Sequence, residues 1–192
     1  LKKIKKQFFD YIVVSPGINI KKCGLKNFII NNINKIITDL DLFYLNFSDN
    51  IKITITGTNG KSTTSKLLYE IIKKHTKNVK LVGNIGNPVL SQKSTNSKTI
   101  FVIEASSYQI EYSKFFKTDN AMILNISPDH LERHGNFSRY VDAKLKLISQ
   151  QDNNCFAYIE KKNKYLKNKL KILKPKSKIF YVNLNNIFKL EK

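Results

Sequence analysis

The segment Thr56-Gly57-Thr58-Asn59-Gly60-Lys61-Ser62-Thr63 has the residue types of a phosphate-binding loop. Glycines let backbone N–H groups approach a phosphate, a lysine in the position of Lys61 reaches the terminal phosphates, and the Ser62 hydroxyl can ligate Mg²⁺. The common form of this loop has a further glycine where this chain has Ile55. The pattern predicts binding of a nucleoside triphosphate, and an ordinary strand-to-helix turn with a Ser/Thr cap is the alternative.

Two other segments carry side chains suited to metal or proton chemistry. Glu104 ends the apolar run Ile100–Ile103, where an unpaired carboxylate is costly to bury. Ligation of Mg²⁺ would account for Glu104, and simple solvation is the alternative. Asp129 and His130 lie in a loop that holds a second histidine and further charged residues. That cluster favours a functional site, although a single histidine is more often a surface or capping residue.

Two weaker candidates are open to simple structural explanations. Ser106-Ser107-Tyr108-Gln109 offers hydroxyls and an amide to a substrate, and it equally predicts a helix N-cap. Lys144 lies in an amphipathic segment, residues 140–147. Of the 34 basic residues 32 are lysines, so the pattern alone does not separate Lys144 from a solvated helix lysine.

Apolar periodicity predicts strands that alternate with helices. This order predicts an α/β fold with a mostly parallel sheet flanked by helices. Functional loops follow the carboxyl ends of such strands, so the loops after four of the predicted strands are expected to face one crevice. The predicted strands are Tyr11–Val14, Lys35–Thr38, Lys52–Thr56, Val79–Val82, Thr99–Glu104, Ala121–Asn125, Cys155–Ile159 and Lys178–Val182, and the predicted helices are Leu25–Ile33, Leu40–Phe47, Ser62–Lys74 and Phe137–Ser149.

The net charge of +20 suggests nucleic-acid binding, but the composition argues against it. Only Arg133 and Arg139 are arginines, and arginine is the preferred residue for bidentate reading of bases. The abundance of Lys, Asn and Ile is what an AT-rich genome would produce. No apolar run is long enough to span a membrane, and two distant cysteines suggest a reducing cytoplasm. We therefore expect a cytoplasmic protein with neither a nucleic-acid nor a membrane partner.

Five segments, in order, resemble the Mur ligase family, the ATP-dependent amide-forming enzymes of peptidoglycan precursor synthesis. The short phosphate loop of that family accounts for Ile55. The Lys-Ser-Thr run is similar to the branch of the family that adds D-glutamate. The resemblance extends from about Tyr11 to Ile159, and its segments are Ser15-Pro16-Gly17-Ile18, Gly57–Thr63, Gly83-Asn84-Ile85-Gly86, Glu104–Gln109 and Asn125–His134.

The resemblance implies a role for each matched residue. Lys61, His130 and Lys144 would be catalytic, with Lys144 carbamylated. Mg²⁺ ions would be held by Ser62, Glu104, His130 and Lys144. ATP would be bound by Gly57, Thr58, Asn59, Gly60, Lys61, Ser62 and Thr63. The substrate would be bound by Ser15, Pro16, Gly17, Asn84, Ser106 and Gln109.

The resemblance also implies the domain organisation and the reaction. Residues 1–47 would be the C-terminal part of a Rossmann-like domain for a UDP-linked substrate. Residues 48–192 would be a truncated P-loop-type mononucleotide-binding central domain, with the family's C-terminal amino-acid-binding domain absent. The implied reaction joins D-glutamate to UDP-N-acetylmuramoyl-L-alanine through an acyl phosphate in a monomeric enzyme. A chain that begins with Leu1 and lacks that domain is expected to be inactive alone.

Three alternatives remain open at this stage. One is another amide ligase of the superfamily, such as a folylpolyglutamate-type enzyme, which a screen of acceptor amino acids would identify. Another is a basic nucleic-acid-binding module, whose binding would weaken steeply with salt. The last is a degenerate remnant that keeps the motifs without activity.

Overall fold

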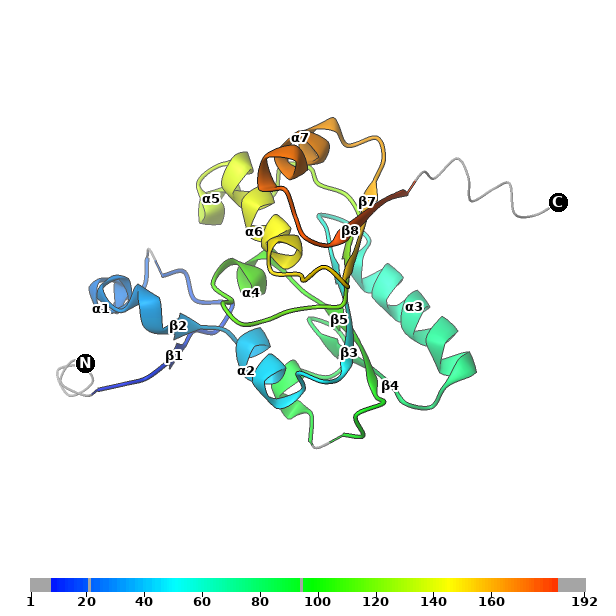
Figure 1. The fold of residues 1–192 in the computed structure, drawn as a ribbon. Helices are drawn as coiled ribbons and strands as arrows, with labels where there is room; N and C mark the ends of the chain where they lie inside the picture. The colour runs from blue at the N-terminus through cyan, green and yellow to red at the C-terminus, as the bar shows by residue number, and fades with distance from the viewer. Residues whose placement is uncertain (1–7, 21, 94, 183–192) are drawn as a thin grey trace.

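A six-stranded parallel sheet forms the centre of the protein (Figure 1). The computed structural model describes residues 8–20, 22–93 and 95–182. Every pairing between neighbouring strands of the sheet is parallel, which confirms the predicted fold class. In spatial order the strands are β4 (Val79–Gly83), β5 (Ile100–Glu104), β3 (Ile51–Thr56), β6 (Asn120–Ile123), β7 (Phe156–Glu160) and β8 (Lys178–Val182).

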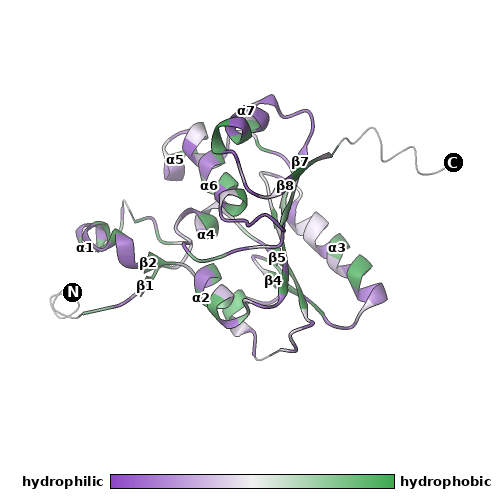
Figure 2. Ribbon diagram, viewed as in Figure 1, coloured by the Kyte–Doolittle hydropathy of each residue, from purple (hydrophilic) through white to green (hydrophobic). Residues whose placement is uncertain are grey.

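Helices cover the sheet on both sides, and an apolar core fills each interface (Figures 1 and 2). On one side α3 (Lys61–His75) packs over Ile55, Val79 and Val102. The larger core lies on the other side, where the helices meet the opposite faces of β5, β6 and β7. The helices of that side are α2 (Asp39–Asn46), α4 (Ser107–Glu111), α6 (Phe137–Ser149) and α7 (Lys164–Leu173).

A smaller unit precedes the central sheet. In it β1 (Ile12–Val13) pairs in parallel with β2 (Ile36–Ile37), and α1 (Lys26–Asn31) and the short 3-10 helix η2 (Ile33–Lys35) connect them. Its own core consists of Val14, Ile20, Ile29 and Ile36. This unit therefore has a separate, small hydrophobic centre.

Helix α2 belongs with the central sheet by its packing. Leu40, Phe43 and Phe47 are members of the large core. The buried Asp41 side chain accepts hydrogen bonds from the backbone N–H groups of residues 114, 115 and 116 at 2.7, 2.7 and 3.0 Å. We therefore propose a boundary between the two units near Thr38, in place of the one predicted after residue 47.

All eight predicted strands and all four predicted helices are present, and their ends differ by a few residues at most. Helix α6 spans the predicted residues because Asn136 caps it, its side chain accepting a hydrogen bond from the Arg139 N–H at 2.9 Å. Five further helical elements of the described residues were not predicted as helices, although an N-cap was considered at the start of α4. They are η2, the 3-10 helix η3 (Val89–Ser91), α4, α5 (Leu131–His134) and α7. Among the described residues, no helix has the length and apolar character needed to cross a membrane.

The turn after β4 brings its loop against β5. Gly83 has a φ of 108°, and a Cβ placed there would lie 2.2 Å from the Glu104 carbonyl oxygen. The close approach lets the Asn84 N–H donate to that same carbonyl at 2.9 Å. Only glycine fits this position, because both the positive φ and the close contact exclude a side chain.

We expect Gly83→Ala to lower the free energy of unfolding by roughly 3 kcal/mol, since the added methyl group must displace backbone atoms of β5. Urea denaturation of the two proteins measures the difference. Gly24→Ala is the control, because a Cβ at Gly24 meets no atom within 4 Å. Equal urea midpoints for Gly83→Ala and the unmodified protein would contradict this account of the turn.

Candidate functional site

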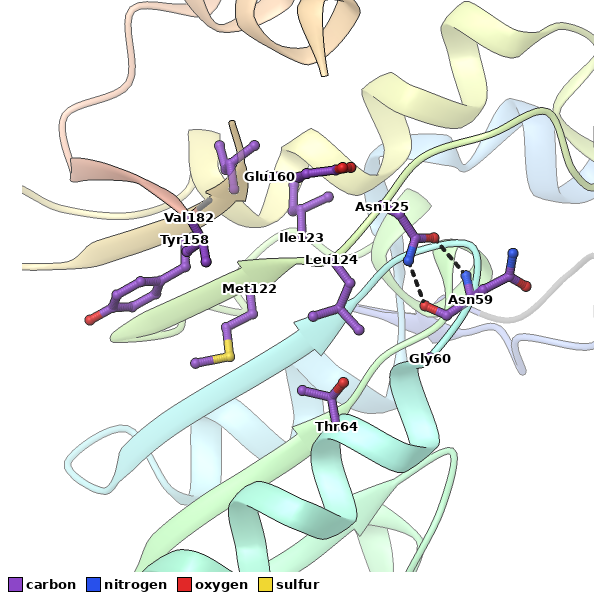
Figure 3. A pocket seen from close by; sticks show the side chains of 11 residues that line it. Asn59, Gly60, Thr64, Met122, Ile123, Leu124, Asn125, Tyr158, Glu160 and Val182 are labelled. Atoms are coloured by element: carbon purple, nitrogen blue, oxygen red, sulfur yellow. Dashed lines mark hydrogen bonds between the residues drawn. The ribbon is translucent and has the colours of Figure 1, made fainter. Parts of the chain in front are cut away.

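The phosphate loop lies between the end of β3 and the start of α3. Gly60 has a φ of 79° and is the N-cap of the helix, so glycine suits the left-handed turn there. The loop is held by Asn125, whose side chain accepts from the Asn59 N–H at 2.8 Å and donates to the Asn59 carbonyl at 3.0 Å (Figure 3). Ser62 and Thr63 are exposed in the first turn of α3. The free N–H groups of that turn favour an anion.

Two lysine side chains converge on one backbone carbonyl of this loop. The Lys61 Nζ donates to the Gly57 carbonyl at 3.1 Å and to the Thr58 carbonyl at 2.8 Å. The Lys144 Nζ donates to the same Gly57 carbonyl at 2.9 Å and to the Thr56 hydroxyl at 3.3 Å. The structure thus places Lys144 beside the phosphate loop, and its role as a carbamylated metal ligand stays a prediction.

The environment of Lys144 favours its neutral form. Its side chain is buried, with 1% of its surface exposed. Burial, and to a smaller extent the charge of Lys61, lower the pKa of its amine from 10.5 to about 7, against the opposing effect of Asp129. A neutral amine is a nucleophile, so Lys144 is suited to react with carbon dioxide at neutral pH.

Glu104 lies at the end of β5, with 1% of its surface exposed. Its Oε1 accepts from the Asn84 side chain at 3.3 Å, while its Oε2 is buried and has no hydrogen-bond partner among the described residues. A buried carboxylate oxygen without a partner is costly. The simple solvated carboxylate considered from the sequence is therefore ruled out for Glu104, and a cation ligand would satisfy its free oxygen.

His130 lies in the loop after β6 and is about half exposed. Its backbone is left-handed, with a φ of 51°, and it is the N-cap residue of α5. The Nε2 atom lies 3.4 Å from the Asp129 carboxylate, and the ring packs against Tyr108 at a centroid distance of 5.0 Å. The His130 side chain is therefore oriented by neighbours and still reachable from solvent.

The four strands predicted to end at one crevice, β4, β5, β3 and β6, are neighbours in the sheet. Within the described residues, no three side chains of His, Cys, Asp or Glu are grouped so that they could hold a metal ion. The predicted Mg²⁺ ligands also include a hydroxyl and a lysine carbamate. Such a site would take its remaining oxygens from phosphate groups and water, as Mg²⁺ sites commonly do.

The predicted substrate residues differ in their exposure and in the hydrogen bonds that their side chains already make. Ser106 and Gln109 form a capping box at the start of α4, with the Gln109 N–H donating to the Ser106 hydroxyl at 3.3 Å. The Gln109 amide also donates to Asp39 at 2.9 Å, so its side chain is buried and engaged. The capping interpretation is confirmed, and substrate binding by these two residues stays a prediction. Ser15 and Gly17 are exposed in the turn after β1.

Tyr140 is a site residue that the sequence did not single out. Its hydroxyl shares a hydrogen bond with the Thr58 hydroxyl at 3.0 Å, and the Lys144 Nζ lies 4.7 Å from its ring centroid. Burial raises the pKa of the Tyr140 phenol above its usual value, so the hydroxyl keeps its proton. The available signal was its spacing, four residues before Lys144 and thus on the same helix face.

A cavity of about 550 Å³ adjoins the phosphate loop (Figure 3). Asn59, Gly60 and Thr64 line one side, and side chains from the ends of β6, β7 and β8 line the other. Met122 and Tyr158 are among these, so part of the lining is apolar. The cavity thus adjoins the loop that is predicted to bind phosphate, and its apolar lining could accommodate a ring.

Comparison with known proteins gives one family. The sequence model of the "Mur ligase middle domain" matches residues 55–190. UDP-N-acetylmuramoylalanine–D-glutamate ligase of Rickettsia bellii is 41% identical over 163 residues, which are 84% of this chain and 35% of that protein. The protein of the same name from Elusimicrobium minutum is 41% identical over 179 residues, 88% of this chain and 39% of that protein. The chain thus spans little more than a third of these relatives.

Solved structures show the same fold at low sequence identity. The UDP-N-acetylmuramate:L-alanyl-γ-D-glutamyl-meso-diaminopimelate ligase of Neisseria meningitides matches with a TM-score of 0.63 and 15% identity, over 90% of this chain and 58% of that one. The MurF ligase of Thermotoga maritima, solved with ADP, matches with a TM-score of 0.58 and 18% identity, over 93% of this chain and 49% of that one.

The burial of Lys144 predicts a dependence of stability on pH. Below pH 7 the amine is charged in both the folded and the unfolded states, and folding bears the full cost of burying the charge. Between the folded pKa of about 7 and the unfolded value of 10.5, only the unfolded state binds the proton, so stability rises with pH. We expect a gain of the order of 4 kcal/mol across this window relative to Lys144→Met.

Urea denaturation in buffers free of carbon dioxide, from pH 6 to pH 10, measures this difference. The exposed residue Lys66 gives the control, since Lys66→Met should follow the pH profile of the unmodified protein. Parallel profiles for Lys144→Met and the unmodified protein would show that Lys144 titrates normally.

Proposed function

The chain belongs to the Mur ligase family, and on that premise we propose that it takes part in the ATP-dependent addition of D-glutamate to UDP-N-acetylmuramoyl-L-alanine. The choice of amino acid and of UDP-linked substrate rests on the names of relatives about 40% identical to this chain. The single structural observation that supports the proposal is the convergence of Lys61 and Lys144 at the Gly57 carbonyl. This arrangement places one lysine cation, Lys61, and one lysine amine suited to carbamate formation, Lys144, where a triphosphate would lie.

The phosphate loop gives this chain its part in binding ATP. Backbone N–H groups at the start of α3 and the Lys61 ammonium would neutralise the charge that moves between phosphate oxygens. Phosphoryl transfer needs such positioning and charge neutralisation more than it needs covalent help from the protein. The cavity beside Asn59 and Thr64 offers space for the nucleoside.

The predicted metal ligands suit Mg²⁺. Ser62 and Glu104 would hold one ion, and His130 and Lys144, the latter as a carbamate, would hold a second. When bound, Mg²⁺ would supply charge neutralisation to the phosphates. A carbamate converts the cationic lysine into an anionic oxygen ligand. The unpaired Glu104 Oε2 and the low pKa of Lys144 both fit this assignment.

The proposed reaction has two steps. The substrate carboxylate attacks the γ-phosphorus of ATP, which forms an acyl phosphate and releases ADP. The amine of D-glutamate then attacks the acyl carbon, and the resulting tetrahedral intermediate expels phosphate to leave an amide. In this chain, Asn84, in the turn after β4, would orient the muramoyl substrate, and its side chain donates to Glu104 at 3.3 Å.

We expect the protein to bind ATP in the presence of Mg²⁺, and Lys61→Ala to weaken binding by about tenfold or more, because a charge-assisted contact to phosphate is lost. Isothermal titration calorimetry measures both affinities. Lys66→Ala is the matched control, since Lys66 is exposed on the same helix. Equal ATP affinity in Lys61→Ala would sink the proposed nucleotide site.

We also expect a carbamate to form on Lys144 in bicarbonate buffer. Its neutral amine attacks carbon dioxide, forms an N–C bond and releases one proton. Carbon-13 NMR with labelled bicarbonate should show one carbamate signal that Lys144→Met removes. Lys146→Met is a demanding control, because burial lowers the pKa of Lys146 as well. A signal that survives Lys144→Met would assign the carbamate elsewhere.

A further inference from the structure

Asp39 is a partly buried carboxylate that connects two helices on the same side of the sheet (Figure 1). It lies in the first turn of α2, and its Oδ2 atom accepts a hydrogen bond from the side-chain amide of Gln109 in α4 at 2.9 Å. Gln109 is buried, with 4% of its surface exposed. The sequence did not single out Asp39, because its partner is 70 positions away in the chain.

Two neighbours of fixed hydrogen-bonding character determine the orientation of the Gln109 amide. A carboxylate only accepts, so the Gln109 Nε2 atom must face Asp39. A backbone N–H only donates, and the Ser106 N–H donates to the Gln109 Oε1 atom at 3.1 Å. The reversed amide would place two acceptors together at Asp39 and two donors together at Ser106. The side-chain amide of Gln109 therefore has one favoured orientation.

The same amide orients the Ser106 hydroxyl. The Ser106 Oγ atom donates to the Gln109 Oε1 at 3.2 Å and accepts from the Gln109 backbone N–H at 3.3 Å. A hydroxyl has one proton and two lone pairs, so its proton is engaged and one lone pair remains for another donor. Ser106 is partly exposed, whereas Gln109 is buried. The series Asp39, Gln109, Ser106 thus ends in a hydroxyl that solvent reaches.

A purely structural role explains Asp39 less well. A carboxylate in the first turn of α2 interacts favourably with the helix dipole, but it would do so in full contact with solvent as well. Burial instead raises the pKa of Asp39 above its usual value, and the hydrogen bond from Gln109 opposes this. The capping box of α4 needs only Ser106 and Gln109. Neither helix therefore requires a desolvated carboxylate at this position.

Helix α2 also holds the far end of the segment that begins at Ser106. The Asp41 carboxylate accepts from the backbone N–H groups of residues 114, 115 and 116. Ser106 itself lies in the loop after β5, and β5 neighbours β3, which ends at the phosphate loop. The free lone pair of Ser106 is therefore held at the edge of the sheet where the proposed reaction would occur.

We propose that Asp39 is a positioning residue for the muramoyl substrate. It fixes the Gln109 amide, the amide directs the Ser106 proton inward, and Ser106 then offers an acceptor to an N–H or O–H group of the substrate. The proposal rests on the proposed function, which supplies that substrate. The family resemblance implies substrate binding by Ser106 and Gln109, whereas the role of Asp39 and the acceptor character of Ser106 follow from their contacts.

Hydrogen exchange, followed by NMR, tests the positioning without a ligand. Asp39→Leu removes the acceptor of the Gln109 Nε2, so the Ser106 N–H should exchange at least about fivefold faster relative to the Ile103 N–H in the buried strand β5. The ratio of these two rates separates local release from a general loss of stability. Asp39→Asn should restore the ratio to within about twofold, because its amide carbonyl can accept from the Gln109 Nε2.

Calorimetry with UDP-N-acetylmuramoyl-L-alanine tests the consequence for binding. Asp39→Leu and Ser106→Ala should each weaken binding about fivefold or more, and Asp39→Asn should stay within about twofold of the unmodified protein. The double variant of Asp39→Leu and Ser106→Ala should bind within about twofold of Ser106→Ala, because Asp39 acts through Ser106. Asp49→Leu is the matched control, since Asp49 is an exposed carboxylate just beyond the end of α2, and it should leave binding unchanged.

Four results would overturn the proposal: an unchanged exchange ratio in Asp39→Leu, unchanged substrate affinity in that variant, losses that multiply in the double variant, or no substrate binding by the unmodified protein. Asp39→Ala takes the place of Asp39→Leu, with the same expectations, if the leucine variant shows no cooperative thermal unfolding. ATP binding with Mg²⁺, measured on the same samples, should be the same with and without Asp39→Leu. A failure of this positioning is thereby distinguished from a failure of the proposed nucleotide site.

Discussion

The site depends on one electrostatic conflict, the approach of two lysine amines to the Gly57 carbonyl. Two ammonium ions at one acceptor repel each other, and the buried member, Lys144, is the one that yields its proton more readily. The conflict is relieved by a polyanion at Lys61, by loss of the Lys144 proton, or by its conversion to a carbamate. Phosphate binding and lysine chemistry are therefore linked through a single backbone oxygen.

The fold maintains this conflict by fixing both lysines to rigid elements. Lys61 begins α3, which packs on one face of the sheet, and Lys144 projects from α6, which packs on the other. Their side chains reach the same loop because β3 ends between the two helices. Tyr140 strengthens the arrangement, since its hydroxyl holds Thr58 while its ring lies beside the Lys144 amine. A shift of either helix would separate the two lysine amines and remove the smaller cause of the low Lys144 pKa, the larger cause being burial.

Local patterns predicted the elements and the loop, whereas three-dimensional packing selected the important side chains. The strand before Gly57 and the helix cap at Asn136 are determined by residues that are adjacent in the sequence. Features of this kind can be recognised from the sequence alone. The residues next to Lys144 in the sequence do not distinguish it from the other lysines of the chain. Its contacts in the folded protein are with residues 56 and 57, which are far away in the sequence. Helix α7 was not predicted because the segment 160–178 is rich in lysine. Its buried residues, Leu166 and Leu170, are four positions apart and therefore lie on one face of the helix.

Positive charge therefore has two physical roles in this protein. Exposed lysines set the net charge of +20, and they interact weakly with any polyanion through screened, long-range attraction. Lys144 is more than nine-tenths buried, and its amine donates to the backbone of the phosphate loop. Its pKa of about 7 sets it apart from the exposed lysines, because it can lose its proton near neutral pH. The chemistry of this one amine is therefore separate from the overall charge of the protein.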